Sequence, residues 1–515
     1  MSETDPRDVL RRALIEIRSL KQRLATIEQQ GGRAEPVAVC GLGCRFPGGV
    51  DGPAAFWRLL IEGREAIGPR PPGRWAADNA AAPLPGGFLD DVEGFDARFF
   101  EIAPREAAAM DPQHRLLLEV AWEALEHAAI SPQALAGSRT GVFVGLATND
   151  YARRVPADAV DRYFGVGSSP AVASGRIAYL LDLRGPCVTL DTACSSSLVA
   201  VHYAMRALHD RDCDTALAGG VSLMLAPELG ESFGAAGMLA PDGRCKSFDA
   251  GADGYGRAEG AGLVVLRRFD DALAAGDPVL AVLRGSAINQ DGKSAGLTAP
   301  NGPAQTALIQ AGLGAAGMSV DDIDYVETHG TGTPLGDPIE WHALAAAFAG
   351  RQRKLPIGSV KTNIGHTEAA SGIAGLIKTV LMLEHDTIPP SRNFSRRNPA
   401  IADSGAALEL SLAPVPGVRR AAVSAFGFSG TNAHVVLEAP PARQPLAVSG
   451  EGVLLISARD PDALRELAGR YRDAFAAGLD FLAACHTAAT GRALLPWWIA
   501  ARSPAELAAA VPSNA

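Results

Sequence analysis

The sequence lacks the features of several protein classes, and each absence excludes something. Its seven cysteines are scattered over 515 residues without the two close pairs of a zinc site or the framework of a disulfide scaffold. It has no excess of positive charge: the net charge is −10, which disfavours nucleic acid and anionic membranes as partners. No apolar run reaches the length of a membrane span, and charged residues occupy the N-terminus where a signal peptide would be apolar. We therefore expect a cytoplasmic protein with free thiols.

The remaining composition is that of an ordinary globular enzyme. Hydrophobic residues make up 47% of the chain and charged residues 20%. The length is sufficient for one large core or for two to three domains. Function must therefore be sought in local motifs.

One cysteine has the sequence surroundings of a nucleophile. Cys194 lies in the segment VTLDTACSSS at 188–197, where a β-branched run ends in small residues and a helical pattern begins. At the N-terminus of a helix, the dipole lowers the pKa of a thiol and favours the thiolate. Taken alone, a free cysteine is more often a buried, inert residue, so the assignment depends on other motifs.

Two histidines follow strand-like segments and are surrounded by glycine. His329 lies in ETHGTGT at 327–333, and His366 ends KTNIGH at 361–366. Glycines at such positions indicate that the backbone approaches another group closely. Either histidine alone would more commonly be structural or solvated. A fourth motif, AFGFSGTNAH at 425–434, would by itself be a glycine-rich turn between strands.

Together and in this order, the four motifs resemble the ketosynthase (β-ketoacyl synthase) domain of modular type I polyketide synthases, in the thiolase superfamily. The similarity runs from about Pro36 to Glu438. It includes three further segments, VAVCGLGCRFPGG at 37–49, MDPQHRLLLE at 110–119 and APDGRCK at 240–246. Several independent motifs in one order make this resemblance specific.

The resemblance implies a thiolase-like α/β fold, duplicated and built of five layers in the order αβαβα. The nucleophile is then expected in the first half and the histidines in the second, with the site between the halves. Strand-like and helix-like patterns alternate over residues 34–440, which favours α/β layers. The clearest expected strands are 140–145, 215–220 and 262–266.

The resemblance also implies how the acyl group is held. Cys194 is expected to attack the thioester of a chain carried on the phosphopantetheine of an acyl or peptidyl carrier protein, and to keep it as an acyl-enzyme. The backbone N–H groups of Cys194 and Phe428 are expected to form the oxyanion hole. No bound cofactor and no metal are implied.

The remaining site residues follow from the same resemblance. His329 and His366 are expected to stabilise the enolate formed when a malonyl extender loses CO2, and one of them to move protons. Lys361 is expected to hold His329 through hydrogen bonds. Thr331 and Thr333 are expected to contact the phosphopantetheine arm.

The two ends of the chain differ from this central region. Residues 6–29 predict a helix with a heptad seam of about three repeats, too short to dimerise stably alone. Residues 1–33 are either a solvated helix or, as the resemblance favours, a docking helix for an upstream synthase subunit. The homodimer expected of a thiolase-type fold would then form through the ketosynthase region, 34–440.

Residues 441–515 begin with a proline-rich linker and then resemble the small α/β linker domain that joins ketosynthase to acyltransferase. A strand over 453–457, a helix over 461–477 and the segment CHTAATGR at 485–492 carry this likeness. No acyltransferase nucleophile motif and no carrier attachment motif occur in the sequence. The protein is therefore expected either to be cut from a longer synthase or to act as a stand-alone ketosynthase.

These site residues are compatible with two reactions, and chain elongation is the preferred one. The first is decarboxylative Claisen condensation of a polyketide or polyketide–peptide chain. The second is intramolecular aldol addition and lactone-forming release by a ketosynthase-like bicyclase of the salinosporamide type. A Cys-His hydrolase and a non-catalytic chain-length-factor-like partner are disfavoured, because four condensing-enzyme motifs and all three reactive side chains are present.

Overall fold

The structure is a computed structural model that describes residues 35–75, 85–401, 407–442, 450–509 and 513–514. The expected N-terminal helix over 6–29, and with it the docking unit 1–33, lies outside the described residues.

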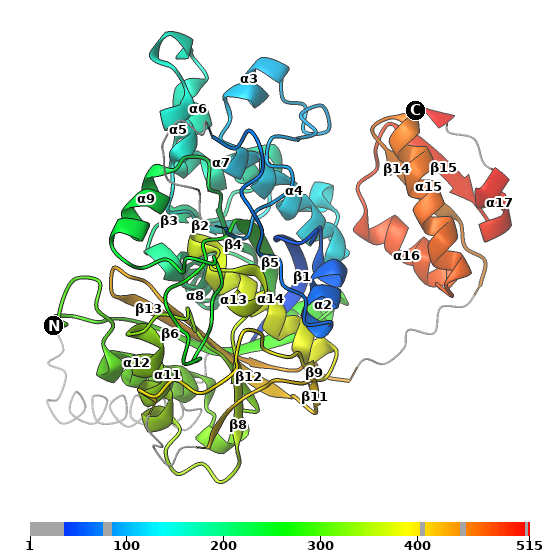
Figure 1. Cartoon of the computed structure of the whole chain (residues 1–515). Coiled ribbons are helices and arrows are strands. Elements are labelled where there is room, and N and C mark those ends of the chain that lie inside the picture. Colours follow the sequence, from blue (N-terminus) through cyan, green and yellow to red (C-terminus); the bar gives the residue numbers. More distant parts are fainter. Residues whose placement is uncertain (1–34, 76–84, 402–406, 443–449, 510–512, 515) are drawn as a thin grey trace, which may run out of the picture.

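A mixed sheet of eleven strands forms the centre of the molecule (Figure 1). Its two halves meet where β1 pairs with β6 over only three residues, Val37–Val39 against Ala281–Leu283. In sheet order the strands are β10 (Leu408–Leu410), β8 (Leu355–Gly358), β7 (Tyr325–Glu327), β12 (Arg420–Phe426), β13 (Thr431–Glu438), β6 (Ala281–Gln290), β1 (Val37–Arg45), β5 (Gly260–Arg268), β4 (Thr215–Ser222), β2 (Thr140–Gly145) and β3 (Cys187–Leu190).

Helices cover both outer faces of this sheet and fill the space between its halves (Figure 1). The long helices are α4 (Pro112–His127) and α7 (Pro170–Leu180) outside the first half, α8 (Ser196–His209) and α14 (Ser371–Glu384) between the halves, and α11 (Gly302–Ala316) and α12 (Gly336–Ala347) outside the second half. α14 is buried from Ser371 to Leu383, and α8 buries mainly small and apolar residues but leaves Tyr203 and Arg206 exposed. The predicted five-layer, thiolase-like α/β fold is therefore confirmed.

The strands predicted from sequence are present. Residues 140–145 form β2 with the predicted bounds, and 215–220 and 262–266 fall inside the longer β4 and β5. β4 and β5 are buried on both faces, which explains their nearly continuous runs of small and apolar residues.

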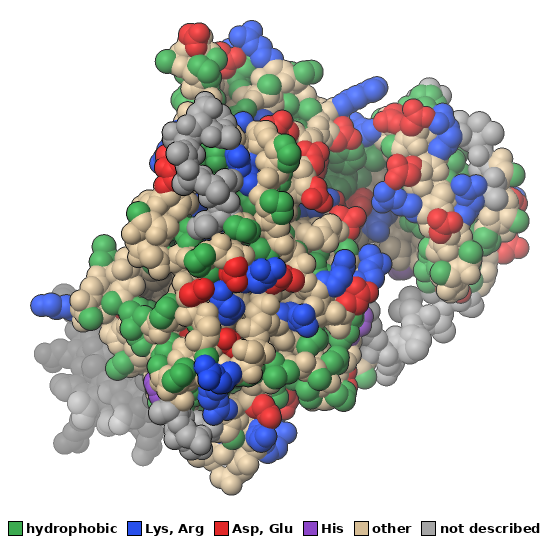
Figure 2. Space-filling view, viewed as in Figure 1, with side chains coloured by type: hydrophobic (Ala, Val, Ile, Leu, Met, Phe, Trp, Pro, Cys, Tyr) green, Lys and Arg blue, Asp and Glu red, His purple; other side chains and the backbone are tan. Residues whose placement is uncertain are grey.

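Short helices and a two-stranded ribbon complete the central region. They are α2 (Pro53–Ile61), α3 (Pro104–Ala109), α5 (Asp150–Arg154), α6 (Phe164–Ser168), α9 (Glu228–Ala235), α10 (Phe269–Ala275), α13 (Lys361–Ile364), β9 (Thr387–Ile388) and β11 (Val415–Pro416). No helix in the described part of the chain is long and apolar enough to cross a membrane. Acidic and basic side chains are interspersed over the face shown in Figure 2.

The C-terminal segment forms a separate small core of three strands and three helices (Figure 1). Its elements are β14 (Leu454–Ala458), α15 (Pro461–Ala476), α16 (Phe481–Gly491), β15 (Trp497–Ala501), α17 (Pro504–Ala509) and β16 (Ser513–Asn514). It touches the central region through Arg492, which donates to the carbonyl of Glu126, and through Leu494, whose backbone bonds the side chain of Gln133. The division of the chain at residue 440 stays a prediction.

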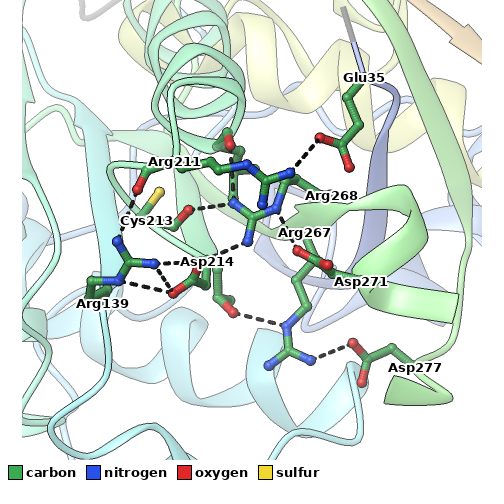
Figure 3. Close-up of polar contacts among 11 residues, drawn as sticks. Glu35, Arg139, Arg211, Cys213, Asp214, Arg267, Arg268, Asp271 and Asp277 are labelled. Atoms are coloured by element: carbon green, nitrogen blue, oxygen red, sulfur yellow. Dashed lines mark hydrogen bonds and ion pairs between the residues drawn. The ribbon is translucent and has the colours of Figure 1, made fainter. Parts of the chain in front are cut away.

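A charged network anchors the end of α8 that lies away from Cys194 (Figure 3). The buried Arg268, at the end of β5, donates to the carbonyls of Leu208 and Cys213 at 3.1 and 2.8 Å. It also pairs with Asp214 and Asp271. A cation at the C-terminus of a helix satisfies its free carbonyls and complements its dipole. This network therefore stabilises the C-terminal end of α8.

Candidate active site

Cys194 lies at a sharp corner between β3 and α8. The corner is held by hydrogen bonds of its own residues: Asp191 accepts from the Ala193 N–H at 2.8 Å, and Ser196 Oγ accepts from the Thr192 N–H at 2.9 Å. Ala193 adopts a left-handed backbone with φ of 57°, a conformation that non-glycine residues rarely take. The fully buried serines at 195–197 pack against Gly145 and Gly427, where a Cβ atom would collide with backbone.

The pKa of the Cys194 thiol lies above its ordinary value, contrary to the sequence-based prediction. Burial and the Glu368 carboxylate raise its pKa, whereas Lys361 and the backbone N–H groups of Phe428 and Cys194 lower it. Burial is the largest of these causes, and the pKa rises to about 12. The predicted low pKa is therefore wrong, because the helix N-terminus does not compensate for the desolvation of the thiolate.

Two backbone N–H groups meet at the sulfur. One belongs to Cys194 itself and the other to Phe428, in the turn between β12 and β13. That turn is closed by the Gly427 N–H, which donates to the Thr431 carbonyl at 2.8 Å, and by Gly430, whose φ is 85°. The arrangement brings the backbone N–H groups of Phe428 and Cys194 together and can bind a developing oxyanion.

The imidazoles of His329 and His366 face each other with ring centroids 5.4 Å apart and planes nearly perpendicular. His329 Nδ1 accepts from the Phe426 N–H at 3.4 Å, and His366 Nδ1 accepts from the Glu368 N–H at 3.2 Å. In a neutral ring whose Nδ1 is an acceptor, the proton resides on Nε2. Burial, reinforced by the charge of Lys361, lowers the pKa of both rings well below the ordinary range. Both histidines are therefore neutral Nε2–H donors at pH 7.

Two buried carboxylates on α12 hold the loop that carries His329. Glu340 accepts from the N–H groups of His329 and Gly330 at 2.7 and 2.8 Å, and Asp337 accepts from the Gly332 N–H at 3.0 Å. Burial raises the pKa of Glu340 to about 7 and that of Asp337 to about 6. The sequence analysis missed both residues. The available signal was a pair of acidic residues three apart on an otherwise apolar helix, which places them on one face.

Lys361 does not hydrogen-bond His329 in the described part of the chain, so the predicted contact is not found. Its side chain is buried, and the hydrogen bonds of His329 run to Phe426 and Glu340. Lys361 instead acts through its charge, which lowers the pKa of both imidazoles and of the thiol.

Thr331 and Thr333 lie in the same loop with their Oγ1 atoms 3.2 Å apart. Thr333 Oγ1 also accepts from the Gly336 N–H at 3.1 Å. Between them, Gly332 packs against the backbone of Lys246, where a Cβ atom would lie 2.5 Å from the Lys246 nitrogen. Their contact with a phosphopantetheine arm stays a prediction.

Comparison with protein families defines the class of this chain. The beta-ketoacyl synthase N-terminal domain matches residues 34–272, the beta-ketoacyl synthase C-terminal domain matches 280–395, and the ketoacyl-synthetase C-terminal extension matches 399–495. The chain therefore belongs to the β-ketoacyl synthase family of condensing enzymes.

Its relatives among known proteins include much longer polyketide synthases. The chain is 54% identical to a phenolphthiocerol/phthiocerol polyketide synthase of Mycobacterium tuberculosis, over 81% of this chain and 28% of that protein. It is 50% identical to erythronolide synthase EryA3 of Saccharopolyspora erythraea, over 92% of this chain and 15% of that protein. The chain thus spans less than a third of the length of either relative.

Solved structures show the same fold. The ketosynthase from module 6 of the bacillaene synthase of Bacillus subtilis 168 superposes with a TM-score of 0.84 at 40% identity, covering 92% of this chain and 83% of that one. A ketosynthase domain of oxazolomycin biosynthesis from Streptomyces albus superposes with a TM-score of 0.85 at 38% identity, covering 92% and 87%.

Proposed function

We propose that this chain extends a carrier-bound polyketide chain by decarboxylative Claisen condensation. Cys194 attacks the acyl thioester on the phosphopantetheine of a carrier protein, and the pantetheine thiol leaves with the cysteine proton. A malonyl-type extender on a carrier then loses CO2, and the resulting carbanion attacks the acyl-enzyme carbonyl. Cys194 leaves as the thiolate, and the product is a β-ketoacyl chain on the carrier.

One observation carries this proposal: two neutral imidazoles present Nε2–H groups at the same site as the thiol and its two backbone N–H groups. The thioester enolate formed by decarboxylation is an anion whose oxygen needs hydrogen-bond donors, and the Nε2–H of a neutral imidazole is such a donor. The backbone pair serves the other anion, the tetrahedral intermediate on Cys194. Thr331 and Thr333 would bind the arm that delivers both substrates.

Dependence on an extender tests the reaction. Supplied with an acyl chain and a malonyl unit on carrier proteins, the enzyme is expected to release one CO2 per condensed product, because the carbanion arises only by decarboxylation. Product and CO2 are followed by mass spectrometry and by trapping of labelled carbon. A single carrier-bound chain without extender should give no ring. Cyclised product under that condition would establish intramolecular aldol and lactone formation in place of elongation.

We also propose that the protein is a homodimer paired through β3. Among the described residues, this strand is the edge of the sheet and pairs with β2 alone. Cys187 and Val188 on it are exposed, and so is Tyr179 on the adjacent α7, at 82%. An exposed apolar edge strand is a template for pairing with a second chain, and a two-fold axis would place β3 against its own copy.

Replacing Val188 by lysine is expected to shift the protein from dimer to monomer, because two lysines would face each other across the paired edge strands. Light scattering over a dilution series measures the change. Leu412→Lys is the matched control, since Leu412 is also about half exposed but lies outside β3. Deleting residues 1–33 should leave the dimer intact. A dimer that survives Val188→Lys but not this deletion would place the interface in the N-terminal segment.

Further proposals concern the domains, the cellular location and the partners of this chain. Residues 1–33 would dock an upstream synthase subunit, residues 34–440 would form the ketosynthase domain and 441–515 a linker domain. The protein would work in the cytoplasm with carrier proteins and without nucleic acid or membrane partners. The much greater length of the related polyketide synthases supports the carrier and subunit partners.

A further inference from the structure

A buried ion pair lies beside the candidate active site and takes no part in the chemistry proposed above. The Arg257 guanidinium, just before β5, binds the Glu368 carboxylate through Nε to Oε1 at 2.6 Å and Nη2 to Oε2 at 3.0 Å. The two side chains are only 7% and 10% exposed. Burying two charges sacrifices their hydration, so such a pair is weak evidence for stability alone. The position of this ion pair next to the turn that carries Cys194 indicates a role in the site.

The Glu368 carboxylate lies close to the reactive thiol. Glu368 opens a short 3₁₀ turn, 368–370, that packs against the turn carrying Cys194. Ser371 Oγ, at the end of the same turn, donates to the Cys194 carbonyl at 2.9 Å. After burial itself, Glu368 is the strongest influence raising the pKa of the Cys194 thiol.

The other titratable groups around the thiol cannot cancel that carboxylate fully. Lys361 is the cation that opposes it, and it also faces Glu327 and Glu340. His329, His366 and Tyr255 are uncharged, because burial lowers the pKa of the two imidazoles and raises that of the phenol. Arg257 is therefore the counter-ion that binds Glu368 directly.

The same pair also fixes the His366 loop. Glu368 has a left-handed backbone, with φ of 43°, and in that conformation its N–H reaches His366 Nδ1 at 3.2 Å. Arg257 is itself paired with His366 along the backbone, since the flanking Gly256 carbonyl and Ala258 N–H bond the N–H and carbonyl of His366 at 2.8 Å each.

Arg257 is held on its other side by α9. Its guanidinium carbon lies 5.5 Å from the ring centroid of Phe233, which in turn lies 6.2 Å from the ring of Phe428. A Cβ atom at Gly230 would approach Arg257 Nη1 to 3.3 Å, so the helix packs directly on the guanidinium. Through Phe233, the Arg257 side chain thus connects the His366 loop with Phe428, whose backbone N–H faces the Cys194 sulfur.

We propose that Arg257 is a positioning residue: it neutralises the Glu368 carboxylate beside Cys194, so that the thiolate required for acyl transfer can form, and it keeps the Glu368 N–H on His366 Nδ1. The role in acyl transfer rests on the function proposed above. The electrostatic role can be tested on the thiol alone, without any acyl substrate.

The test is the rate at which iodoacetamide alkylates Cys194 in the full chain between pH 7 and pH 9, followed by mass spectrometry of the Cys194 peptide. Only the thiolate reacts, and one unit of pKa changes its fraction tenfold below the pKa. Arg257→Met leaves the carboxylate unpaired and should slow alkylation about tenfold. Glu368→Gln leaves the guanidinium unpaired and should accelerate it about tenfold. The double variant should return to within about threefold of the parent rate.

Two further variants separate charge from damage to the fold. Arg257→Lys keeps the positive charge and should restore most of the alkylation rate lost in Arg257→Met. Arg176→Met removes another buried arginine, which lies on α7 and pairs with Glu106, and should leave the Cys194 rate unchanged.

The decisive result is that Arg257→Met slows the alkylation of Cys194 whereas Glu368→Gln accelerates it. Rates that change in the same direction, or that do not change, would overturn the proposal, and the near-isosteric Glu368→Gln suffices if Arg257→Met fails to fold. Failure of the proposed function has a different signature: the alkylation rates would follow the pattern above, but no acyl group would transfer from a carrier to Cys194.

Discussion

Replacing Cys194 by alanine is expected to abolish acyl loading and to lower turnover by about 10⁴–10⁶-fold. The methyl group cannot form a thioester, and Ser195, Ser196 and Ser197 beside it are fully buried. Incubation with an acyl thioester, followed by intact-mass measurement, should show one acyl group on the parent protein and none on the variant. Since burial raises the pKa of the thiol to about 12, loading of the parent should accelerate as pH rises from 7 to 9.

Cys245→Ala is the matched control for this prediction. Cys245 is also buried, and its pKa is also raised to about 12, chiefly by burial. Its Sγ lies 3.8 Å from the Gly256 carbonyl, without the pair of N–H groups that meets the sulfur of Cys194. The control should load normally. An acyl adduct that persists in Cys194→Ala would move the nucleophile elsewhere.

Replacing either His329 or His366 by alanine is expected to leave loading intact and to reduce product formation roughly 10²–10⁴-fold, the range for positioned acid–base groups. Each variant removes one Nε2–H donor from the enolate but leaves the backbone N–H pair at Cys194 in place. Loading is measured by intact mass, and condensation by CO2 release from a malonyl carrier. His→Gln at either position keeps an N–H near the place of Nε2 and should recover part of the rate.

The pH profile gives an independent check on the histidines. Because the pKa of both rings is lowered well below the ordinary range, they stay neutral as pH falls through 6.5 and protonate only at more acidic pH. The imidazole signals of both residues, followed by NMR, should therefore show no titration centred near pH 6.5. Condensation itself also responds to Glu340 and Asp337, whose pKa values are raised to about 7 and about 6. Normal turnover in either alanine variant would reduce that histidine to a structural role.

The sequence alone predicted the fold class and the main strands, which the structure confirms, and it indicated the three side chains, Cys194, His329 and His366, that we propose as reactive. The strands follow from local patterns, whereas the fold class and the site residues followed from the resemblance of four motifs, taken together, to the ketosynthase family. The bounds of β2 could be predicted to the residue because the strand is a short, fully buried apolar run.

Only the tertiary structure decided the electrostatics of the site, because burial and long-range pairing are not local properties. The pKa of Cys194 is set mainly by desolvation, which has no sequence signature and reversed the prediction made from the helix dipole. Arg257 and Glu368 are 111 residues apart, and Glu340 holds a loop that begins eleven residues before it. Such contacts form only when the two halves of the sheet have packed around α8 and α14. That packing brings Cys194, the two histidines and the Arg257–Glu368 ion pair into one candidate site.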